Sequence, residues 1–294
     1  MFKGIYTALA TPFTQEGKTD FKALETLLEK QIAAGIDGVV LLGTTAEAAT
    51  LDEAEKDELL CMAMKQINRR VKVLIGTGTN CTRTMLQNTE AALKHHPDGV
   101  LIVTPYYNKP NPSGLVEHFR LAGQLGAPIV LYHIPGRTGQ KLPLGVVEQL
   151  LQQVPQIQAV KEADYDAARL SSLATQFAGR LELLCGNDDL FLPHLSLNAS
   201  GIISAAANVL APAFVQIYKA WQKGQTPKAF ALFKQALPLI QACYLETNPT
   251  CVKYALSQRG IGTEAVRLPL GPVSAENKKK VDGALKQTPA DLLI

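Results

Sequence analysis

Short apolar runs alternate with amphipathic helical segments along most of the chain. The runs are rich in β-branched side chains, and in the segments between them apolar residues recur at helical spacing. The pattern predicts eight strands, at residues 5–9, 38–42, 71–75, 99–103, 128–132, 157–161, 181–185 and 201–204.

The segments between the strands have boundaries that particular side chains specify. The first predicted helix begins with Asp20 as its N-cap and stops at Gly35. A second helix begins after Asp52 and carries Leu59 and Ile67 on one apolar stripe. Strands that are separated by helices must pair in parallel, through right-handed crossovers.

Eight strand–helix units are compatible with an open doubly wound sheet or with a closed barrel. No Gly-x-Gly-x-x-Gly motif follows the first strand, where a dinucleotide-binding sheet places it. The number of units favours the barrel. We expect an α/β chain with a (β/α)8 TIM barrel at residues 1–224 and a C-terminal helical appendage at residues 225–294, with helices at 226–244, 249–258 and 274–286.

Composition and charge exclude several classes of protein. A net charge of +3 over 294 residues provides no field suited to nucleic acid or to an anionic membrane surface. The cysteines are odd in number and form no Cys-x-x-Cys pair, which indicates reduced thiols in the cytoplasm. Residues 1–13 lack the apolar core of a signal peptide, and Ser204, Asn208 and Pro212 interrupt the apolar stretch at 199–217, so we expect no membrane segment.

Lys161 stands where the sixth apolar run ends, directly before Glu162. Burial disfavours a charged ammonium group, and a lysine with a lowered pKa becomes an amine nucleophile for carbonyl substrates. A lysine also closes a strand simply because the chain is reaching the surface. Lys161 alone therefore leaves both interpretations open.

The carboxyl ends of the predicted strands collect polar side chains. In a barrel, catalytic groups stand at these ends and in the loops that follow them. Each residue alone has an ordinary interpretation as a turn, packing or surface residue, but purely structural residues would scatter over both rims. The residues at this rim are Thr44, Thr45, Tyr106, Tyr107, Tyr132, Arg137, Lys161 and Gly186.

Six segments resemble, in order and spacing, the dihydrodipicolinate synthase branch of the pyruvate-dependent lyases, which also include N-acetylneuraminate lyase. The resemblance covers nearly the whole chain and is weakest near its end. The segments are GTTAEAATL at 43–51, VTPYYNKP at 103–110, YHIPGRTG at 132–139, VKEA at 160–163, GND at 186–188 and NPTCVK at 248–253.

The resemblance implies a Schiff-base aldol reaction without a cofactor. Lys161, as the free amine, attacks the keto carbon of pyruvate and forms an iminium, which lets the methyl carbon lose a proton. The enamine then attacks the aldehyde of aspartate semialdehyde. Ring closure releases the lysine and gives 4-hydroxy-tetrahydrodipicolinate, the first committed step of diaminopimelate and lysine biosynthesis.

The resemblance also implies a role for each residue of the rim. Tyr132 moves protons, and Thr44 extends that relay together with a Tyr107 contributed by the neighbouring subunit. Because Tyr107 completes a neighbour's site, we expect a homo-oligomer that is a dimer of dimers. Thr45 holds the pyruvate carboxylate, and the backbone near Gly186 and Ile203 lines the pyruvate pocket.

Arg137 distinguishes between branches of the family. A guanidinium binds a carboxylate in a bidentate manner, and aspartate semialdehyde carries a carboxylate at its far end. The sialic acid lyases lack an arginine here. The alternatives are a related aldolase that acts on a sugar acid, and a non-catalytic paralogue, which is expected to lose Lys161 or Tyr132.

The chain departs from the family pattern at three positions. Ala46 and Ala48 replace a glycine and a serine, and His133 replaces an asparagine. We expect His133 to be a side chain bonded within the protein and not a base. His95 and His96 have no third ligand in view, so we expect no metal site.

Lysine-sensitive members of the family bind lysine at a subunit interface, using an asparagine that Asn80 matches. Thr84 stands where those enzymes have a carboxylate, and Lys56 stands where they have a histidine. We therefore expect lysine to inhibit weakly or not at all, with Glu53 as the side chain that could replace the missing carboxylate.

Overall fold

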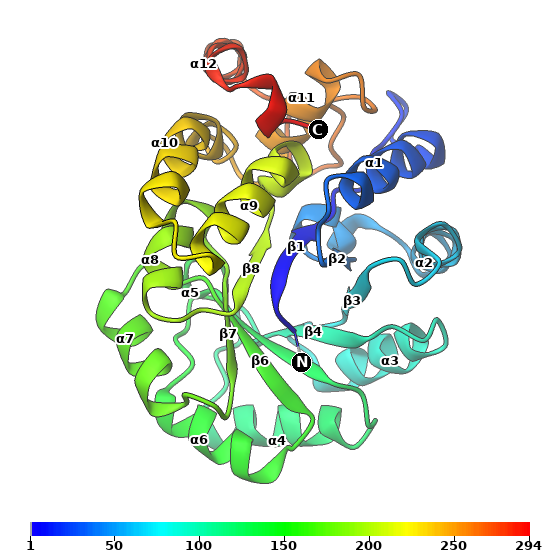
Figure 1. The fold of residues 1–294 in the computed structure, drawn as a ribbon. Helices are drawn as coiled ribbons and strands as arrows, with labels where there is room; N and C mark the ends of the chain where they lie inside the picture. The colour runs from blue at the N-terminus through cyan, green and yellow to red at the C-terminus, as the bar shows by residue number, and fades with distance from the viewer. Residues whose placement is uncertain (1) are drawn as a thin grey trace. The chain divides into compact units, whose positions relative to one another are not determined.

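The computed structural model describes residues 2–294, and its strands form a closed parallel barrel in the order β1 to β8 (Figure 1). The predicted barrel is confirmed, and each predicted strand is present with its ends shifted by no more than one residue. The strands are β1 Gly4–Ala8, β2 Gly38–Leu41, β3 Lys72–Gly76, β4 Gly99–Val103, β5 Ile129–His133, β6 Ile157–Glu162, β7 Glu182–Cys185 and β8 Gly201–Ser204.

Helices follow the strands, and side chains cap several of them as the sequence predicts. Asp20 accepts a hydrogen bond from the backbone of Ala23, and Asp52 forms a capping box with Glu55. The helices are α1 Phe21–Ala33, α2 Glu53–Ile67, α3 Thr82–Leu93, α4 Pro112–Gly123, α5 Pro135–Thr138, α6 Leu144–Gln153, α7 Ala167–Gln176, α8 Phe191–Ser196 and α9 Ala207–Gln222, followed by α10 Thr226–Ala242, α11 Thr250–Gln258 and α12 Ala275–Gln287.

The chain divides into two compact units. The first unit is residues 73–203 with a short N-terminal segment, and the second unit is Gly4–Lys72 with Ser204–Ile294. The predicted boundary between residues 224 and 225 falls in the turn between α9 and α10, and this division into a barrel and an appendage stays a prediction.

Each unit has its own packing. In the first, α4 and α6 lie side by side outside the strands (Figure 1), and Phe119, Val147 and Leu150 are fully buried in their shared core. In the second, Asn208 of α9 holds the end of β1, because its side chain donates to Ala8 O at 2.7 Å and accepts from the backbone N–H of residue 10 at 2.9 Å. Burying an aliphatic or aromatic side chain contributes about 1.5–3 kcal/mol, so packing dominates the stability of both units.

None of the helices within residues 2–294 combines the length and the apolar character that crossing a membrane requires. Within the part of the chain that the structure describes, none of the five cysteines forms a disulfide.

Candidate active site

Lys161 and Tyr132 are register partners on the neighbouring strands β6 and β5. Each is only 6% exposed, and Lys161 Nζ lies 4.2 Å from the centroid of the Tyr132 ring. The burial of Lys161 excludes the interpretation that its strand simply reaches the surface. An amine and a phenol therefore lie together at the carboxyl end of the two strands.

The next residue of each strand points to the opposite face, where a buried ionic cluster forms. His133 Nδ1 lies 2.6 Å from Glu162 Oε1, and Arg169 Nε donates to Glu162 Oε2 at 3.0 Å. The backbone N–H of Asp164 also donates to Glu162, at 3.0 Å. His133 is thus bonded within the protein, as expected, and the cluster holds the strand ends that carry Lys161 and Tyr132.

Gly186 follows β7 and packs against the end of β6. Its backbone N–H donates to Glu162 O at 2.7 Å, and a Cβ atom added to it would lie 2.8 Å from Glu162 O and from Ala163 Cβ. Any larger residue would force the two strand ends apart. Ile203 is fully buried in β8.

Tyr107 is held outward by an unusual backbone conformation. Its φ is 71° and its side chain is 89% exposed, although a bulky residue rarely adopts positive φ. The loop is fixed locally, because Asn108 donates to Asn80 O at 2.8 Å and the hydroxyl of Tyr106 lies 3.3 Å from Thr79 Oγ1. Such strain persists where surrounding contacts impose it, often at functional sites.

Arg137 is an exposed residue of the short helix α5, which follows β5. The following turn is anchored, because Gln140 Nε2 donates to Pro110 O at 2.6 Å and the Thr138 hydroxyl donates to Ile134 O at 3.1 Å. The loop of Arg137 is thereby tied to the loop of Tyr107.

Thr44 and Thr45 belong to the second unit, in a 3₁₀ turn that follows β2. Thr44 is exposed, whereas Thr45 is buried and its Oγ1 accepts a hydrogen bond from Asn248 Nδ2 at 2.9 Å. Ala46 lies inside the same turn. A 3₁₀ conformation has negative φ, so alanine replaces glycine here without strain.

No role was predicted for Glu47, Asn248 or Lys253, although all three lie in the motifs at 43–51 and 248–253. Lys253 Nζ lies 2.7 Å from Glu47 Oε1, with both side chains almost fully buried. Burial lowers the pKa of Lys253 to about 8, although the carboxylate of Glu47 opposes that shift. Opposite charges within two apolar motifs were the signal that could have pointed to this pair.

The predicted site residues thus fall into two groups. The first unit brings together Lys161, Tyr132 and Gly186, and it ties the loops of Tyr107 and Arg137 to each other. The second unit carries Thr44 and Thr45. The assembly of the two groups into one site stays a proposal.

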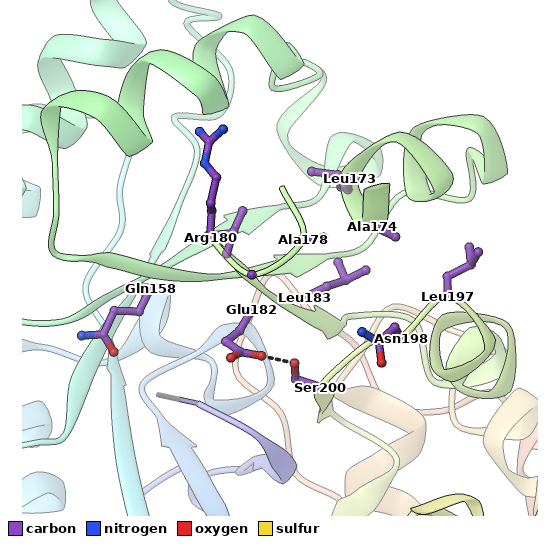
Figure 2. A pocket seen from close by; sticks show the side chains of 12 residues that line it. Gln158, Leu173, Ala174, Ala178, Arg180, Glu182, Leu183, Leu197, Asn198 and Ser200 are labelled. Atoms are coloured by element: carbon purple, nitrogen blue, oxygen red, sulfur yellow. Dashed lines mark hydrogen bonds between the residues drawn. The ribbon is translucent and has the colours of Figure 1, made fainter. Parts of the chain in front are cut away.

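A separate pocket of about 100 Å³ lies within the first unit. Figure 2 shows Glu182 and Ser200 hydrogen-bonded to each other in it, with Gln158 and Leu173 nearby. Gln158 and Glu182 stand at the amino ends of β6 and β7, Ser200 directly precedes β8, and Leu173 lies near the end of α7, so the pocket is at the rim opposite Lys161. No predicted site residue lines this pocket.

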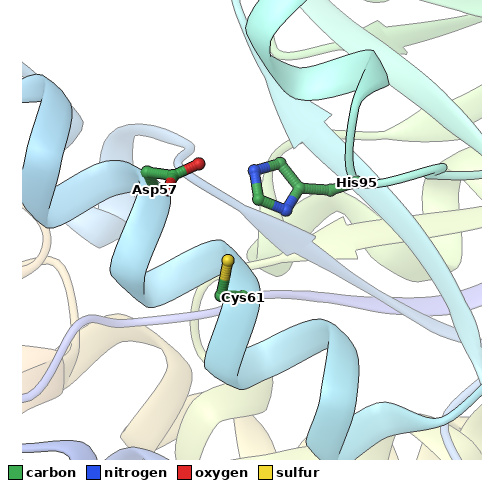
Figure 3. Close-up of side chains that lie close together, drawn as sticks. All are labelled: Asp57, Cys61 and His95. Carbon is green, nitrogen blue, oxygen red and sulfur yellow. The ribbon is translucent and has the colours of Figure 1, made fainter.

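Asp57 and Cys61 are exposed one turn apart on α2 (Figure 3). His95, drawn with them, belongs to the first unit, and exposed acidic groups are common without a metal. The expectation of no metal site stays a prediction.

On α2, Lys56 Nζ lies 2.7 Å from Glu53 Oε1. The carboxylate of Glu53, which could take the place of the carboxylate that is absent at Thr84, is thus already paired with an ammonium group. The weak response to lysine stays a prediction.

Comparisons with known proteins agree along the whole chain. The model of the dihydrodipicolinate synthetase family matches residues 1–288. The 4-hydroxy-tetrahydrodipicolinate synthase of Geobacter metallireducens is 38% identical over 288 residues, which are 98% of this chain and 99% of that protein.

Solved structures show the same similarity. The 4-hydroxy-tetrahydrodipicolinate synthase of Methylacidiphilum fumariolicum SolV has a TM-score of 0.96 at 37% identity, covering 99% of this chain and 97% of that one. The chloride-inhibited dihydrodipicolinate synthase of Acinetobacter baumannii complexed with pyruvate has a TM-score of 0.94 at 33% identity, covering 98% and 99%. A monomeric dihydrodipicolinate synthase variant has a TM-score of 0.94 at 32% identity, covering 97% and 96%.

Proposed function

The chain belongs to the dihydrodipicolinate synthetase family, and on that premise we propose that it catalyses the condensation of pyruvate with L-aspartate semialdehyde to 4-hydroxy-tetrahydrodipicolinate. One observation carries the proposal. Lys161 is a buried amine at the carboxyl end of a parallel strand, and its Nζ lies 4.2 Å from the ring of Tyr132. Such an amine can form a Schiff base with a keto acid.

The reaction proceeds through covalent steps on Lys161. Its neutral amine attacks the keto carbon of pyruvate, water leaves, and the iminium withdraws electrons so that the methyl carbon loses a proton. The enamine adds to the aldehyde carbon of the second substrate. The amine of that substrate then attacks the iminium carbon, which closes the ring and expels the lysine.

Proton transfer accompanies each of these steps, and the proposal gives this role to Tyr132, whose ring centroid lies 4.2 Å from Lys161 Nζ. The proposal gives Thr44 and a Tyr107 from a neighbouring subunit the next places in the relay. The exposure of Tyr107 and its positive φ support a role outside its own subunit.

Substrate binding in this proposal uses two carboxylate sites. Thr45 binds the carboxylate of pyruvate, while the backbone near Gly186 and Ile203 lines the pocket. Arg137 binds the remote carboxylate of aspartate semialdehyde, since its guanidinium supplies paired donors.

The same proposal includes an oligomeric state and a cellular location for the enzyme. A homo-oligomer, a dimer of dimers, follows from the role of Tyr107. A cytoplasmic location is part of the proposal and is supported by cysteines that form no disulfide among the described residues, because thiols stay reduced in that compartment.

Initial rates with different second substrates test the function. With pyruvate held constant, aspartate semialdehyde is expected to be consumed rapidly, whereas cleavage of sialic acid or of a keto-deoxy sugar acid is expected to be negligible. Faster turnover of a sugar acid would overturn the assignment of Arg137 and the proposed substrate.

A further inference from the structure

The turn that carries Thr45 is held by residues far along the chain. Asn248, two residues before the start of α11, donates from Nδ2 to Thr45 Oγ1 at 2.9 Å, across a separation of 203 residues. Both residues are buried, with 8% and 2% of their surfaces exposed. This contact lies entirely within the second unit.

The hydrogen bond fixes what the Thr45 hydroxyl can do. A hydroxyl has one proton to donate and lone pairs that accept. Because a lone pair of Oγ1 is occupied by the amide of Asn248, the hydroxyl proton is turned away from Asn248. Thr45 is therefore preset as a donor, which is the role that a carboxylate requires of it.

A second connection holds the end of the same turn. Glu47 has a φ of 53°, and both of its carboxylate oxygens accept hydrogen bonds from the C-terminal region. Lys253 Nζ donates to Oε1 at 2.7 Å, and the backbone N–H of Arg267 donates to Oε2 at 2.8 Å. Lys253 Nζ also lies 3.8 Å from the centroid of the Phe13 ring.

Removing one partner of a buried ion pair leaves an uncompensated charge, so the Lys253–Glu47 pair is a firm anchor. The backbone of the Thr45 turn is thus fixed at its end by Glu47, and the direction of the Thr45 hydroxyl is fixed by Asn248.

We propose that Asn248 is a positioning residue for the keto-acid carboxylate: it orients the Thr45 hydroxyl as a donor, on a turn that Lys253 anchors through Glu47. The inference rests on the proposed function, since it deepens the assignment of Thr45. It gives the C-terminal helical region a part in substrate binding.

The test is a double-mutant cycle that measures the half-saturation by pyruvate. Asn248→Ala is expected to raise the KM for pyruvate about tenfold, the loss of roughly one hydrogen bond. The kcat at saturating pyruvate and the KM for aspartate semialdehyde are expected to stay within about twofold. In a Thr45→Val background, Asn248→Ala is expected to change the KM for pyruvate less than about twofold, because the hydroxyl is already gone.

Two further variants separate positioning from simple structural support. Asn248→Asp keeps the shape but removes the donor and adds a negative charge, so it is expected to raise the KM for pyruvate more than Asn248→Ala does. Asn277→Ala is the matched control, because Asn277 of α12 donates to Glu246 Oε1 at 2.9 Å in the same region. It is expected to leave the KM for pyruvate unchanged.

Three outcomes would overturn the proposal. They are an unchanged KM for pyruvate in Asn248→Ala, an equal rise of that KM with and without the Thr45 hydroxyl, and failure of both Asn248 variants to fold.

The pyruvate concentration that half-saturates the enzyme is also measured by borohydride trapping with pyruvate alone. A wild-type protein that traps pyruvate but does not condense it with aspartate semialdehyde contradicts the proposed function and leaves this inference testable.

Discussion

At the scale of single residues, burial and partners distinguish between side chains that the sequence presents alike. Lys161 and Lys253 are both buried against aromatic rings, and Lys253 is in addition paired with the carboxylate of Glu47 at 2.7 Å. The position of Lys161 was predictable, because the ends of barrel strands can be recognised in the sequence and catalytic residues stand at their carboxyl ends. The partner of Lys253 was indicated only by an opposite charge in another motif, because the pair spans 206 residues of sequence.

Arg137→Ala is expected to leave imine formation with pyruvate intact and to weaken the binding of aspartate semialdehyde, the second substrate. Loss of a charge-assisted hydrogen bond costs about 1.5–3 kcal/mol, so the KM for aspartate semialdehyde is expected to rise more than about tenfold. Separate apparent constants for the two substrates provide the measurement. If only the constant for pyruvate worsens, Arg137 binds a different ligand.

At the scale of elements, the strands and helices were largely predictable, because apolar spacing and capping residues act locally. The conformations of the loops that hold the proposed catalytic and substrate-binding residues were not predictable. The positive φ of Tyr107 and the hydrogen bond from Gln140 to Pro110 depend on neighbouring strands, and a local pattern contains no information about them.

His118 couples the stability of α4 to pH. Its imidazole is buried, with Nδ1 2.9 Å from Thr82 Oγ1, and burial lowers its pKa from 6.5 to about 4. Below pH 6.5 the unfolded chain therefore binds a proton that the folded chain does not. Stability from this group is present above pH 6.5 and is lost as the pH falls to 4, by up to about 3 kcal/mol.

Urea denaturation at several pH values measures this effect. His118→Gln is expected to flatten the fall in the free energy of unfolding between pH 6.5 and 4. The control is His96→Asn, since His96 is exposed and has a φ of 53°, which asparagine tolerates. An unchanged slope in His118→Gln would contradict the assigned pKa.

At the scale of the whole molecule, counting strand–helix units predicted the closed barrel, because eight such units suit that architecture. The partition into two compact units was not predictable. The second unit joins the first two strands to the C-terminal helices, and contacts such as that of Asn208 with β1 arise only in the folded chain.

Assembly is expected to govern activity, because Tyr107 is proposed to complete a neighbour's site. Sedimentation at assay concentration is expected to show a homotetramer, and Tyr107→Phe is expected to lower kcat while leaving the assembly intact. A fully active monomer would show that Tyr107 acts in its own barrel or not at all, an outcome that the similarity to a monomeric variant makes worth measuring.

Trapping with pyruvate and borohydride, followed by peptide mass spectrometry, tests the central claim most directly. A stable adduct is expected on Lys161 and is expected to disappear in Lys161→Ala, along with nearly all turnover. Lys253 serves as the internal control, since it is also buried but is paired with Glu47. An adduct on Lys253 or on another lysine, or the absence of any adduct, would contradict the assignment of Lys161 as the nucleophile.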